Sequence, residues 1–309
     1  MTGNLRVQHD KPNLLIIGAR GFLGQHLAHQ AVPAFHVVEA DLPAADWKGM
    51  AIDVTSPASI EAGFRDAAPD AVVLLAAVSD IDTCESRPEL AEEVNVHGTN
   101  RVVEACAKAG AKLVFTSSAA VFDGTRHGYR ESDAPTPVSV YGRTKARAEE
   151  FVSRALPSAV ILRLALVVGF ARDHGTNAML NKLAEKLRAG QSVSFPNFEY
   201  RNPIDASTLA RFILELLQLP AASGIFHVGA SEPISRFELG LKLAERLGFS
   251  RDLIKPQTAP LPGRAPRGLD HFLLTERIRA MCSTLIPSCD EVIERAIYGS
   301  PQGSLRARV

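Results

Sequence analysis

The stretch 14–24 constrains this chain most, because a strand, a glycine turn and the start of a helix follow one another there without a gap. The unbroken apolar run 14–17 is typical of a strand buried on both faces. Three evenly spaced glycines follow: Gly18, Gly21 and Gly24. Such glycines permit a tight turn, close approach of the backbone to a pyrophosphate, and close packing of helix on strand. The pattern predicts a phosphate site at a helix N-terminus, with Phe22 and Leu23 in the same loop.

The rest of the chain alternates apolar runs with segments of helical period. The expected further strands are 36–41, 51–54, 71–77, 112–118, 160–169 and 224–229. The expected helices are 25–30, a segment after Ser56, 90–109, 141–155, 178–189, 206–217 and 234–247. Repeated β–α alternation predicts an α/β fold, a Rossmann-type doubly wound parallel sheet with helices on both faces.

Charge and composition exclude several classes of partner. The chain of 309 residues has 34 Lys and Arg against 34 Asp and Glu, so it offers no overall field for nucleic acid or an anionic membrane. No apolar run approaches the ~20 residues of a membrane span, and 1–13 lacks the apolar core of a signal peptide. The four cysteines have no C-x-x-C spacing. We therefore expect a cytoplasmic protein with free thiols and no metal site.

An acidic residue stands where a dinucleotide fold places a carboxylate on the adenosine ribose. Asp41 ends the strand 36–41, roughly 20 residues beyond the glycines. A carboxylate here would repel a 2′-phosphate, which favours NAD over NADP. Arg20, inside the glycine loop, could instead meet a 2′-phosphate, so NADP is not excluded.

A second group of residues has the composition of a carbonyl-reduction site. Ser117 and Ser118 end the strand 112–118, at the edge where open α/β sheets bind ligands. Tyr141 and Lys145 follow, four residues apart on one helix face. A nearby ammonium lowers the pKa of a phenol, and a serine hydroxyl can hold a substrate carbonyl beside it. These are the parts needed for hydride addition with a proton from tyrosine.

Together these residues resemble the extended branch of the short-chain dehydrogenase/reductase superfamily, over nearly the whole chain. Ser118, Tyr141 and Lys145 fall on its catalytic triad, and the three glycines on its cofactor loop. The resemblance also implies cofactor contacts, with Tyr141, Lys145 and Ser117 beside the cofactor. The further residues that match the family's cofactor motifs are Asp53, Val54, Ala76, Ala77 and Asn95.

Within that branch, 121–124 (V-F-D-G) is similar to the dTDP-4-dehydrorhamnose reductase-like proteins. Those proteins usually carry Asp-Tyr before this motif, where this chain has Ala119 and Ala120. The departure leaves the sugar open. It also removes the acid that nucleotide-sugar dehydratases place after their Ser or Thr, which argues against dehydration.

The resemblance implies a smaller, discontinuous substrate domain. The cofactor domain is expected at 12–169 plus 206–230, and the substrate domain at 170–205 plus 231–309. Arg201 matches an arginine that contacts a nucleotide phosphate in the family, and Arg264 or Arg267 could close over a diphosphate. The candidate substrate-binding residues are Ser118, Asn177, Arg201 and Arg264.

Three functions remain open on the sequence. The first is an NAD(P)-dependent reductase of a keto group, as in a 4-keto nucleotide sugar. The second is a nucleotide-sugar 4-epimerase that retains NAD. The third is a non-catalytic cofactor-binding regulatory subunit, like that of methionine adenosyltransferase, which shares this pattern. The resemblance also implies a homodimer formed through the helices 90–109 and 141–155.

Overall fold

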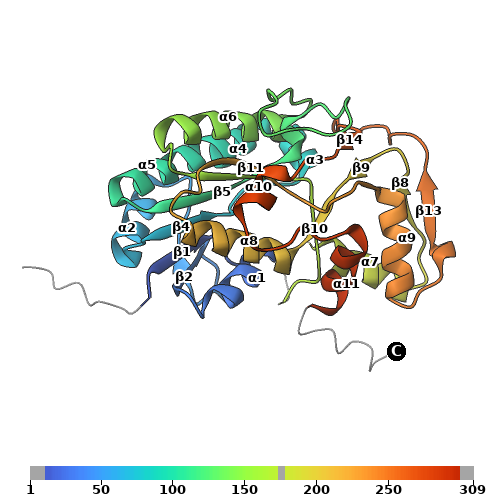
Figure 1. Cartoon of the computed structure of the whole chain (residues 1–309), viewed down its shortest axis with the longest axis horizontal. Coiled ribbons are helices and arrows are strands. Elements are labelled where there is room, and N and C mark those ends of the chain that lie inside the picture. The colour runs from blue at the N-terminus through green and yellow to red at the C-terminus, as the bar shows by residue number, and fades with distance from the viewer. Residues whose placement is uncertain (1–10, 173–177, 300–309) are drawn as a thin grey trace, which may run out of the picture.

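The centre of the computed structural model is a seven-stranded sheet in which every neighbouring pair of strands is parallel (Figure 1). The structure describes residues 11–172 and 178–299, so the candidate Asn177 lies outside the described residues. The strands in spatial order are β11 (Gly224–Val228), β6 (Val160–Leu164), β5 (Lys112–Ser118), β4 (Ala71–Leu74), β1 (Asn13–Ile17), β2 (His36–Asp41) and β3 (Met50–Ala51). The strand order reverses direction between β1 and β4, which confirms the doubly wound Rossmann topology.

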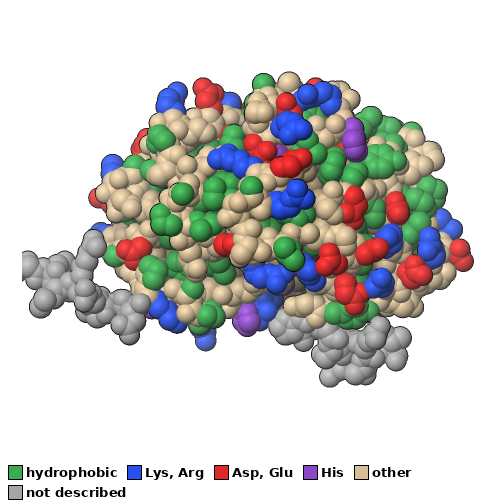
Figure 2. Space-filling model, in the orientation of Figure 1, with side chains coloured by type: hydrophobic (Ala, Val, Ile, Leu, Met, Phe, Trp, Pro, Cys, Tyr) green, Lys and Arg blue, Asp and Glu red, His purple; other side chains and the backbone are tan. Residues whose placement is uncertain are grey.

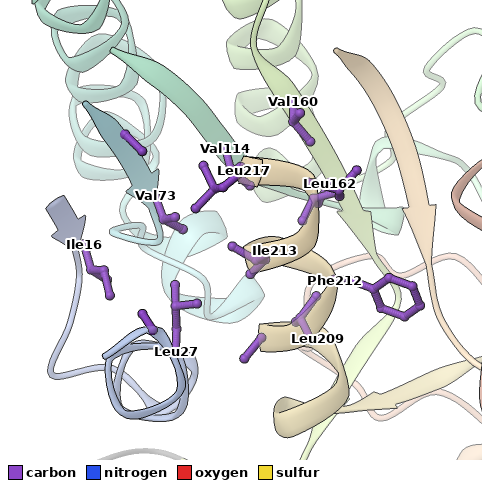
Figure 3. Close-up of a cluster of buried hydrophobic side chains, with 14 of the residues drawn as sticks. Ile16, Leu27, Val73, Val114, Val160, Leu162, Leu209, Phe212, Ile213 and Leu217 are labelled. Atoms are coloured by element: carbon purple, nitrogen blue, oxygen red, sulfur yellow. The ribbon is translucent and has the colours of Figure 1, made fainter. Parts of the chain in front are cut away.

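One face of the sheet is covered by α1 (Phe22–Ala31) and α8 (Ala206–Gln218) (Figure 1). Leu14 and Ile16 of β1 point to this face and are fully buried with Leu27 of α1. Figure 3 shows the cluster, in which side chains of the two helices meet those of the central strands. Alternate residues of a strand point to opposite faces, so an all-apolar strand needs a covered face on both sides.

The opposite face is covered by α2 (Pro57–Ala67), α5 (Thr99–Ala109) and α6 (Val140–Ala155). Leu15 and Ile17 of β1 are buried there. The capping chemistry of α2 follows the sequence pattern: the hydroxyl of its N-cap serine accepts from the backbone, and a proline follows at the first helical position. β1 is therefore the central strand of two cores, as its unbroken apolar run predicted.

A third core lies beyond the carboxyl ends of the main strands, at the right of Figure 1. It is formed by α7 (Met179–Arg188), α9 (Arg236–Arg246) and α11 (Cys289–Tyr298), with β8 (Val193–Pro196) and β13 (Ile254–Gln257) paired in parallel. All five elements come from the segments that we expect to form a substrate domain.

Smaller elements join this part to the main sheet. The three-stranded sheet has the order β12 (Ile234–Ser235), β9 (Tyr200–Arg201) and β14 (Asp270–His271). α10 (Glu276–Met281) then returns to the main sheet, where its Ile278 is buried in the core around α8. Two 3₁₀ turns cover Ala119–Val121 and Arg251–Leu253. The C-terminal segment therefore packs on the main sheet through α10 and on the third core through α11.

The expected strand 160–169 is divided in two. β6 ends at Leu164, where its partner β5 also ends, and beyond this point the main sheet offers no neighbour. After Ala165 the chain continues as β7 (Leu166–Val168), which pairs with β10 (Pro203–Asp205) in a separate sheet. Similarly, the strand expected at 51–54 is only β3, since its partner β2 ends at Asp41.

The expected helix 90–109 contains a wider turn. α3 (Ile81–Ser86) and α4 (Pro88–Glu92) lead into a π-helical segment, Glu93–Gly98, which continues directly into α5. α5 ends at Gly110 in the left-handed region, as its sequence predicted.

None of the helices within the described residues is long and apolar enough to span a membrane. Acidic and basic side chains lie interspersed on the face shown in Figure 2.

Candidate functional site: two adjoining cavities at the sheet edge

A cavity of about 1240 Å³ lies over the glycine turn and the carboxyl ends of the central strands. Gly18 has a φ of 97°, and a Cβ there would lie 2.7 Å from the backbone N of Ala76. Only glycine therefore allows this approach of the turn to the end of β4. No side chain caps the N-terminus of α1, which begins directly after Gly21.

The residues present fit a dinucleotide. An uncapped helix N-terminus with a glycine turn suits a pyrophosphate, and the cavity has the size of a large ligand site. Eleven of the candidate cofactor residues line it: Gly18, Arg20, Gly21, Phe22, Leu23, Gly24, Asp41, Asp53, Val54, Ala76 and Ala77.

At one end of this cavity Asp41 is held by the backbone. Its Oδ2 accepts from the N–H of Arg20 (2.9 Å) and its Oδ1 from the N–H of Leu42 (2.8 Å). The guanidinium of Arg20 pairs with Asp46 at 3.2 Å and lies over the ring of Trp47. At this end of the cavity the carboxylates of Asp41 and Asp46 therefore stand with the guanidinium of Arg20.

A second cavity, of about 400 Å³, adjoins the first and shares several lining residues with it, among them Leu75, Ala77 and Thr116. It brings together Ser118 at the end of β5 with Tyr141 and Lys145 of α6. The hydroxyl of Ser139 caps α6 by accepting from Gly142 N (3.1 Å), which fixes the helix start just before Tyr141. Ser117 also lines this cavity.

The pKa values of the tyrosine and the lysine differ from the sequence-based expectation. Burial raises the pKa of Tyr141 to about 12, although a hydrogen bond with Ser118 opposes the rise. Burial lowers the pKa of Lys145 to about 8, against the opposing effect of Glu149. The Lys145 ammonium also lies 4.3 Å from the ring centre of Phe115. Since burial disfavours both charged forms, the protein alone does not produce the lowered tyrosine pKa that we expected.

Behind this group lies a buried ion pair. Arg163 of β6 and Glu149 of α6 meet at 2.7 Å, with side chains only 2% and 4% exposed. The Nε of Arg163 donates to both oxygens of the same carboxylate (3.0 and 3.1 Å), and Ser117 Oγ donates to Glu149 Oε1 (2.5 Å). The pair therefore connects α6, β6 and the end of β5, the three elements that carry or flank the triad.

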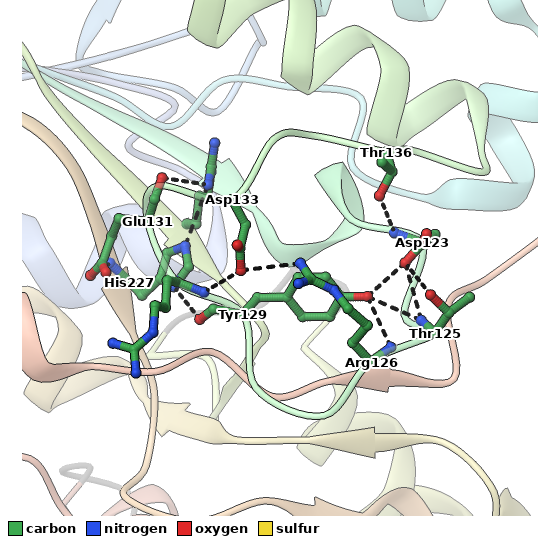
Figure 4. Close-up of polar contacts among 10 residues, drawn as sticks. Asp123, Thr125, Arg126, Tyr129, Glu131, Asp133, Thr136 and His227 are labelled. Carbon is green, nitrogen blue, oxygen red and sulfur yellow. Dashed lines mark hydrogen bonds and ion pairs between the residues drawn. The ribbon is translucent and has the colours of Figure 1, made fainter.

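The V-F-D-G motif contributes a brace for the loop after β5 (Figure 4). Asp123 Oδ1 accepts from Tyr129 Oη (2.6 Å) and from Thr125, and these bonds hold the pKa of the carboxyl at about 2. Arg126 lies over the ring of Tyr129 and pairs with Asp133 at 3.1 Å. The motif shapes the loop that runs into α6.

The arginines expected at the substrate have distinct surroundings. Arg201 lines the smaller cavity, but its Nη atoms donate to Tyr200 O, Leu269 O and Gly268 O and pair with Glu199. Its side chain thus holds the segment around 268–269 in place.

Arg264 does not line the smaller cavity but a neighbouring one of about 310 Å³. Arg267 lines both, and its guanidinium pairs with Asp82 of α3 at 2.8 Å. This ion pair lowers the pKa of Asp82.

Asn95 lines neither of the two adjoining cavities. Its amide accepts from Val78 N (2.8 Å) and donates to Val78 O (3.0 Å) and Thr144 Oγ1 (3.1 Å). It acts on the site indirectly, because it fixes the segment after β4 against the helix that carries Tyr141.

Sequence reasoning missed Glu149, Arg163 and Arg236. Glu149 lies one helical turn beyond Lys145, and a charged Arg163 in an otherwise apolar strand demands a buried partner, so both had a signal. Arg236, which lines the smaller cavity, had no signal in the sequence that marks it as a site residue.

Comparisons with known proteins agree with this architecture. The family model described as RmlD substrate binding domain matches residues 12–299. The dTDP-4-dehydrorhamnose reductase of Mycobacterium tuberculosis is 31% identical over 261 residues, covering 82% of each chain. The methionine adenosyltransferase 2 subunit beta of Xenopus laevis is 28% identical over 258 residues, covering 82% of this chain and 77% of its own.

A solved structure of dTDP-4-dehydrorhamnose reductase from Bacillus anthracis, in complex with NADP, superimposes with a TM-score of 0.85 at 24% identity. It covers 94% of this chain and all of its own. The predicted fold and the resemblance to dTDP-4-dehydrorhamnose reductase-like proteins are thereby confirmed. With a family model that spans nearly all of the described chain, this protein is a member of the RmlD substrate-binding-domain family.

Proposed function

We propose that this protein is an NAD(P)-dependent reductase of the 4-keto group of a nucleotide sugar. One observation carries the proposal: Ser118, Tyr141 and Lys145 line a cavity that adjoins a dinucleotide-sized cavity over the glycine turn. The relatives named as reductases make a dTDP-linked keto sugar the first substrate to test.

In this reaction the side chains of the protein supply the proton and orient the substrate carbonyl and the cofactor. When bound, the reduced nicotinamide supplies a hydride to the carbonyl carbon. The Ser118 hydroxyl holds the carbonyl oxygen, and the phenol of Tyr141 gives that oxygen its proton, so that C=O becomes CH–OH. Lys145, as an ammonium, stabilises the phenolate left on Tyr141 and orients the cofactor ribose.

The direct test is turnover by the purified chain with dTDP-4-dehydrorhamnose and NADH or NADPH. A reductase consumes one equivalent of reduced cofactor per sugar reduced. An epimerase would convert its substrate with no net consumption and would be purified with tightly bound NAD, and this result would replace the first proposal with the second.

The likeness to a regulatory subunit favours one further candidate, a non-catalytic cofactor-binding subunit. The complete set of Ser118, Tyr141 and Lys145 supports catalysis instead. Co-purification with a partner enzyme, together with no turnover of any keto sugar, would support the regulatory role.

The pH dependence should follow Lys145. Its pKa of about 8 means that the ammonium beside Tyr141 is lost as pH rises through 8, whereas Tyr141, with a pKa of about 12, keeps its proton. We expect kcat/KM for reduction to fall above pH ~8, measured from initial rates between pH 6 and 10 with the keto sugar well below its KM. A profile that stays flat to pH ~9.5 would contradict this role of Lys145.

The cofactor preference should depend on Asp41. Its carboxylate opposes a 2′-phosphate, and the guanidinium of Arg20 is paired with Asp46, so we propose NAD as the preferred cofactor. Asp41→Ser should shift the ratio of kcat/KM for NADPH to that for NADH by about tenfold toward NADPH, the scale of one charge repulsion near a surface. Asp66→Asn, a surface acid on α2, is the matched control and should leave the ratio unchanged.

We also propose the two-part domain division expected from the sequence, and a homodimer. The division is supported by the separate third core around α7, α9 and α11. Ile278, which packs with α8, indicates that α10 contributes to the cofactor side.

A further inference from the structure

Three arginines line the smaller cavity, and two of them are satisfied by the protein itself. The Nη atoms of Arg201 donate hydrogen bonds to the carbonyls of Tyr200, Gly268 and Leu269 and to the carboxylate of Glu199. Arg267 donates to both oxygens of Asp82 (3.1 and 2.8 Å) and to Ala265 O (2.9 Å). A ligand could use the donors that make these bonds only if the bonds were lost.

Arg236 differs from both. Its Nε is buried and has no hydrogen-bond partner among the described residues. Its Nη2 contacts only the sulfur of Met179 at 3.6 Å, which is a weak acceptor, and its guanidinium lies 5.9 Å from the ring centre of Phe195. No ion pair joins Arg236 to a carboxylate within 4.0 Å in the parts of the chain that the structure describes.

The surroundings give Arg236 no carboxylate of its own among the described residues. Glu199, whose charge opposes the lowering of the pKa of Arg236, is paired with Arg201. Burial lowers the pKa of Arg236, and the neighbouring guanidiniums of Arg264 and Arg267 act in the same direction. A buried N–H donor that no acceptor of the protein meets is costly.

The position of Arg236 is fixed by the backbone. It is the first residue of α9, its N–H donates to Glu199 O (2.9 Å), and Ser235 before it caps the helix. β12 pairs with β9, which places Arg236 on the same wall as Arg201. Met179, its sulfur contact, lines the cofactor cavity, so Arg236 lies near the junction of the two cavities.

We propose that Arg236 is the anion-binding residue of the smaller cavity and that it binds a phosphate of the substrate's nucleoside diphosphate. Guanidinium donors match phosphate oxygens in geometry and charge, and a bound phosphate would supply the paired negative charge that Arg236 lacks among the described residues. Arg201 is then a positioning residue that holds the wall at 268–269. The assignment deepens the proposed function and rests on it for the identity of the substrate.

Binding of dTDP, dTMP and thymidine to the full chain, measured by titration calorimetry, tests the assignment without turnover. Arg236→Gln should weaken dTDP binding by about tenfold or more and leave thymidine binding unchanged, because only the phosphate contact is removed. Arg236→Lys should recover part of the loss. Arg279→Gln, an exposed arginine on α10, is the matched control and should bind dTDP like the wild type.

Two results would overturn the inference: dTDP binding that is equal in wild type and Arg236→Gln, or absent in both. Equal losses of dTDP and thymidine binding would also overturn it, since they indicate general damage to the cavity. Retained NADH binding and an unchanged melting temperature show that each variant is folded.

Turnover separates this inference from the proposed function. With dTDP-4-dehydrorhamnose, Arg236→Gln should raise KM with little change in kcat. If wild type reduces the sugar but KM is unaffected in the variant, the assignment of Arg236 fails alone. If wild type reduces no keto sugar but binds dTDP through Arg236, the proposed function fails and the anion site stands.

Discussion

Replacing Tyr141 by Phe is expected to lower the rate of keto-sugar reduction by about 10²–10⁴-fold, the usual contribution of a positioned general acid. The substitution removes the phenol that donates the proton but keeps the ring in its place between α6 and the cavity. NADH binding should persist, because the dinucleotide cavity is built on the glycine turn and the ends of β2 and β4. Steady-state kinetics and fluorescence titration of NADH measure the two effects separately.

Tyr200→Phe is the matched control for this loss. Tyr200 is 43% exposed and does not line the cavity, so its variant should reduce the sugar at the wild-type rate. Ser118→Ala should lose less than Tyr141→Phe, since it removes a hydrogen bond to the carbonyl rather than the proton donor. Unchanged turnover in Tyr141→Phe would refute the catalytic assignment.

Loss of the buried ion pair behind the triad should have the largest effect on stability. Arg163→Met leaves the Glu149 carboxylate buried, with Ser117 Oγ as its remaining hydrogen-bond donor among the described residues. A buried charge that loses its ion-pair partner in this way costs about 3–5 kcal/mol in the free energy of unfolding. Denaturant-induced unfolding, followed by circular dichroism, measures the change.

A double variant and a surface pair make this prediction specific. Arg163→Met combined with Glu149→Leu removes both charges and should recover most of the lost stability. Arg251→Met breaks an exposed ion pair with Glu245, whose side chains are 59% and 58% exposed, and should cost less than about 1 kcal/mol. Similar losses in Arg163→Met and Arg251→Met would show that the buried pair contributes no more than a surface contact.

Much of the fold was accessible from the sequence because its signals are local. The apolar run of β1, the glycines after it and Gly110 at the end of α5 each act through their own backbone or immediate neighbours. The division of 160–169 was not accessible, since it depends on where β5 ends and on pairing with β10, which lies far along the chain.

The residues of the site likewise fall into those that local spacing predicts and those that depend on distant parts of the chain. Tyr141 and Lys145 meet because four residues make about one helical turn, so their spacing was enough. Arg201 matched a family motif, but its guanidinium is used by Gly268 and Leu269, which lie 67 and 68 residues later. The Nε of Arg236 has no acceptor among the described residues because no other part of the fold brings one to it. The sequence pattern around Arg236 does not contain this information.

The π-helical segment Glu93–Gly98 lies between two groups of residues that face different parts of the molecule. Leu90 and Val94 face the cofactor cavity, whereas Val102 and Val103 are buried in the core beneath α5. An α-helical turn closes i→i+4 bonds, whereas this segment closes the wider i→i+5 bonds, so it holds an additional residue between these two groups. Removal of the exposed His97 would therefore convert the wide turn to a regular α-helical turn and keep Val94 and Val102 on their own faces.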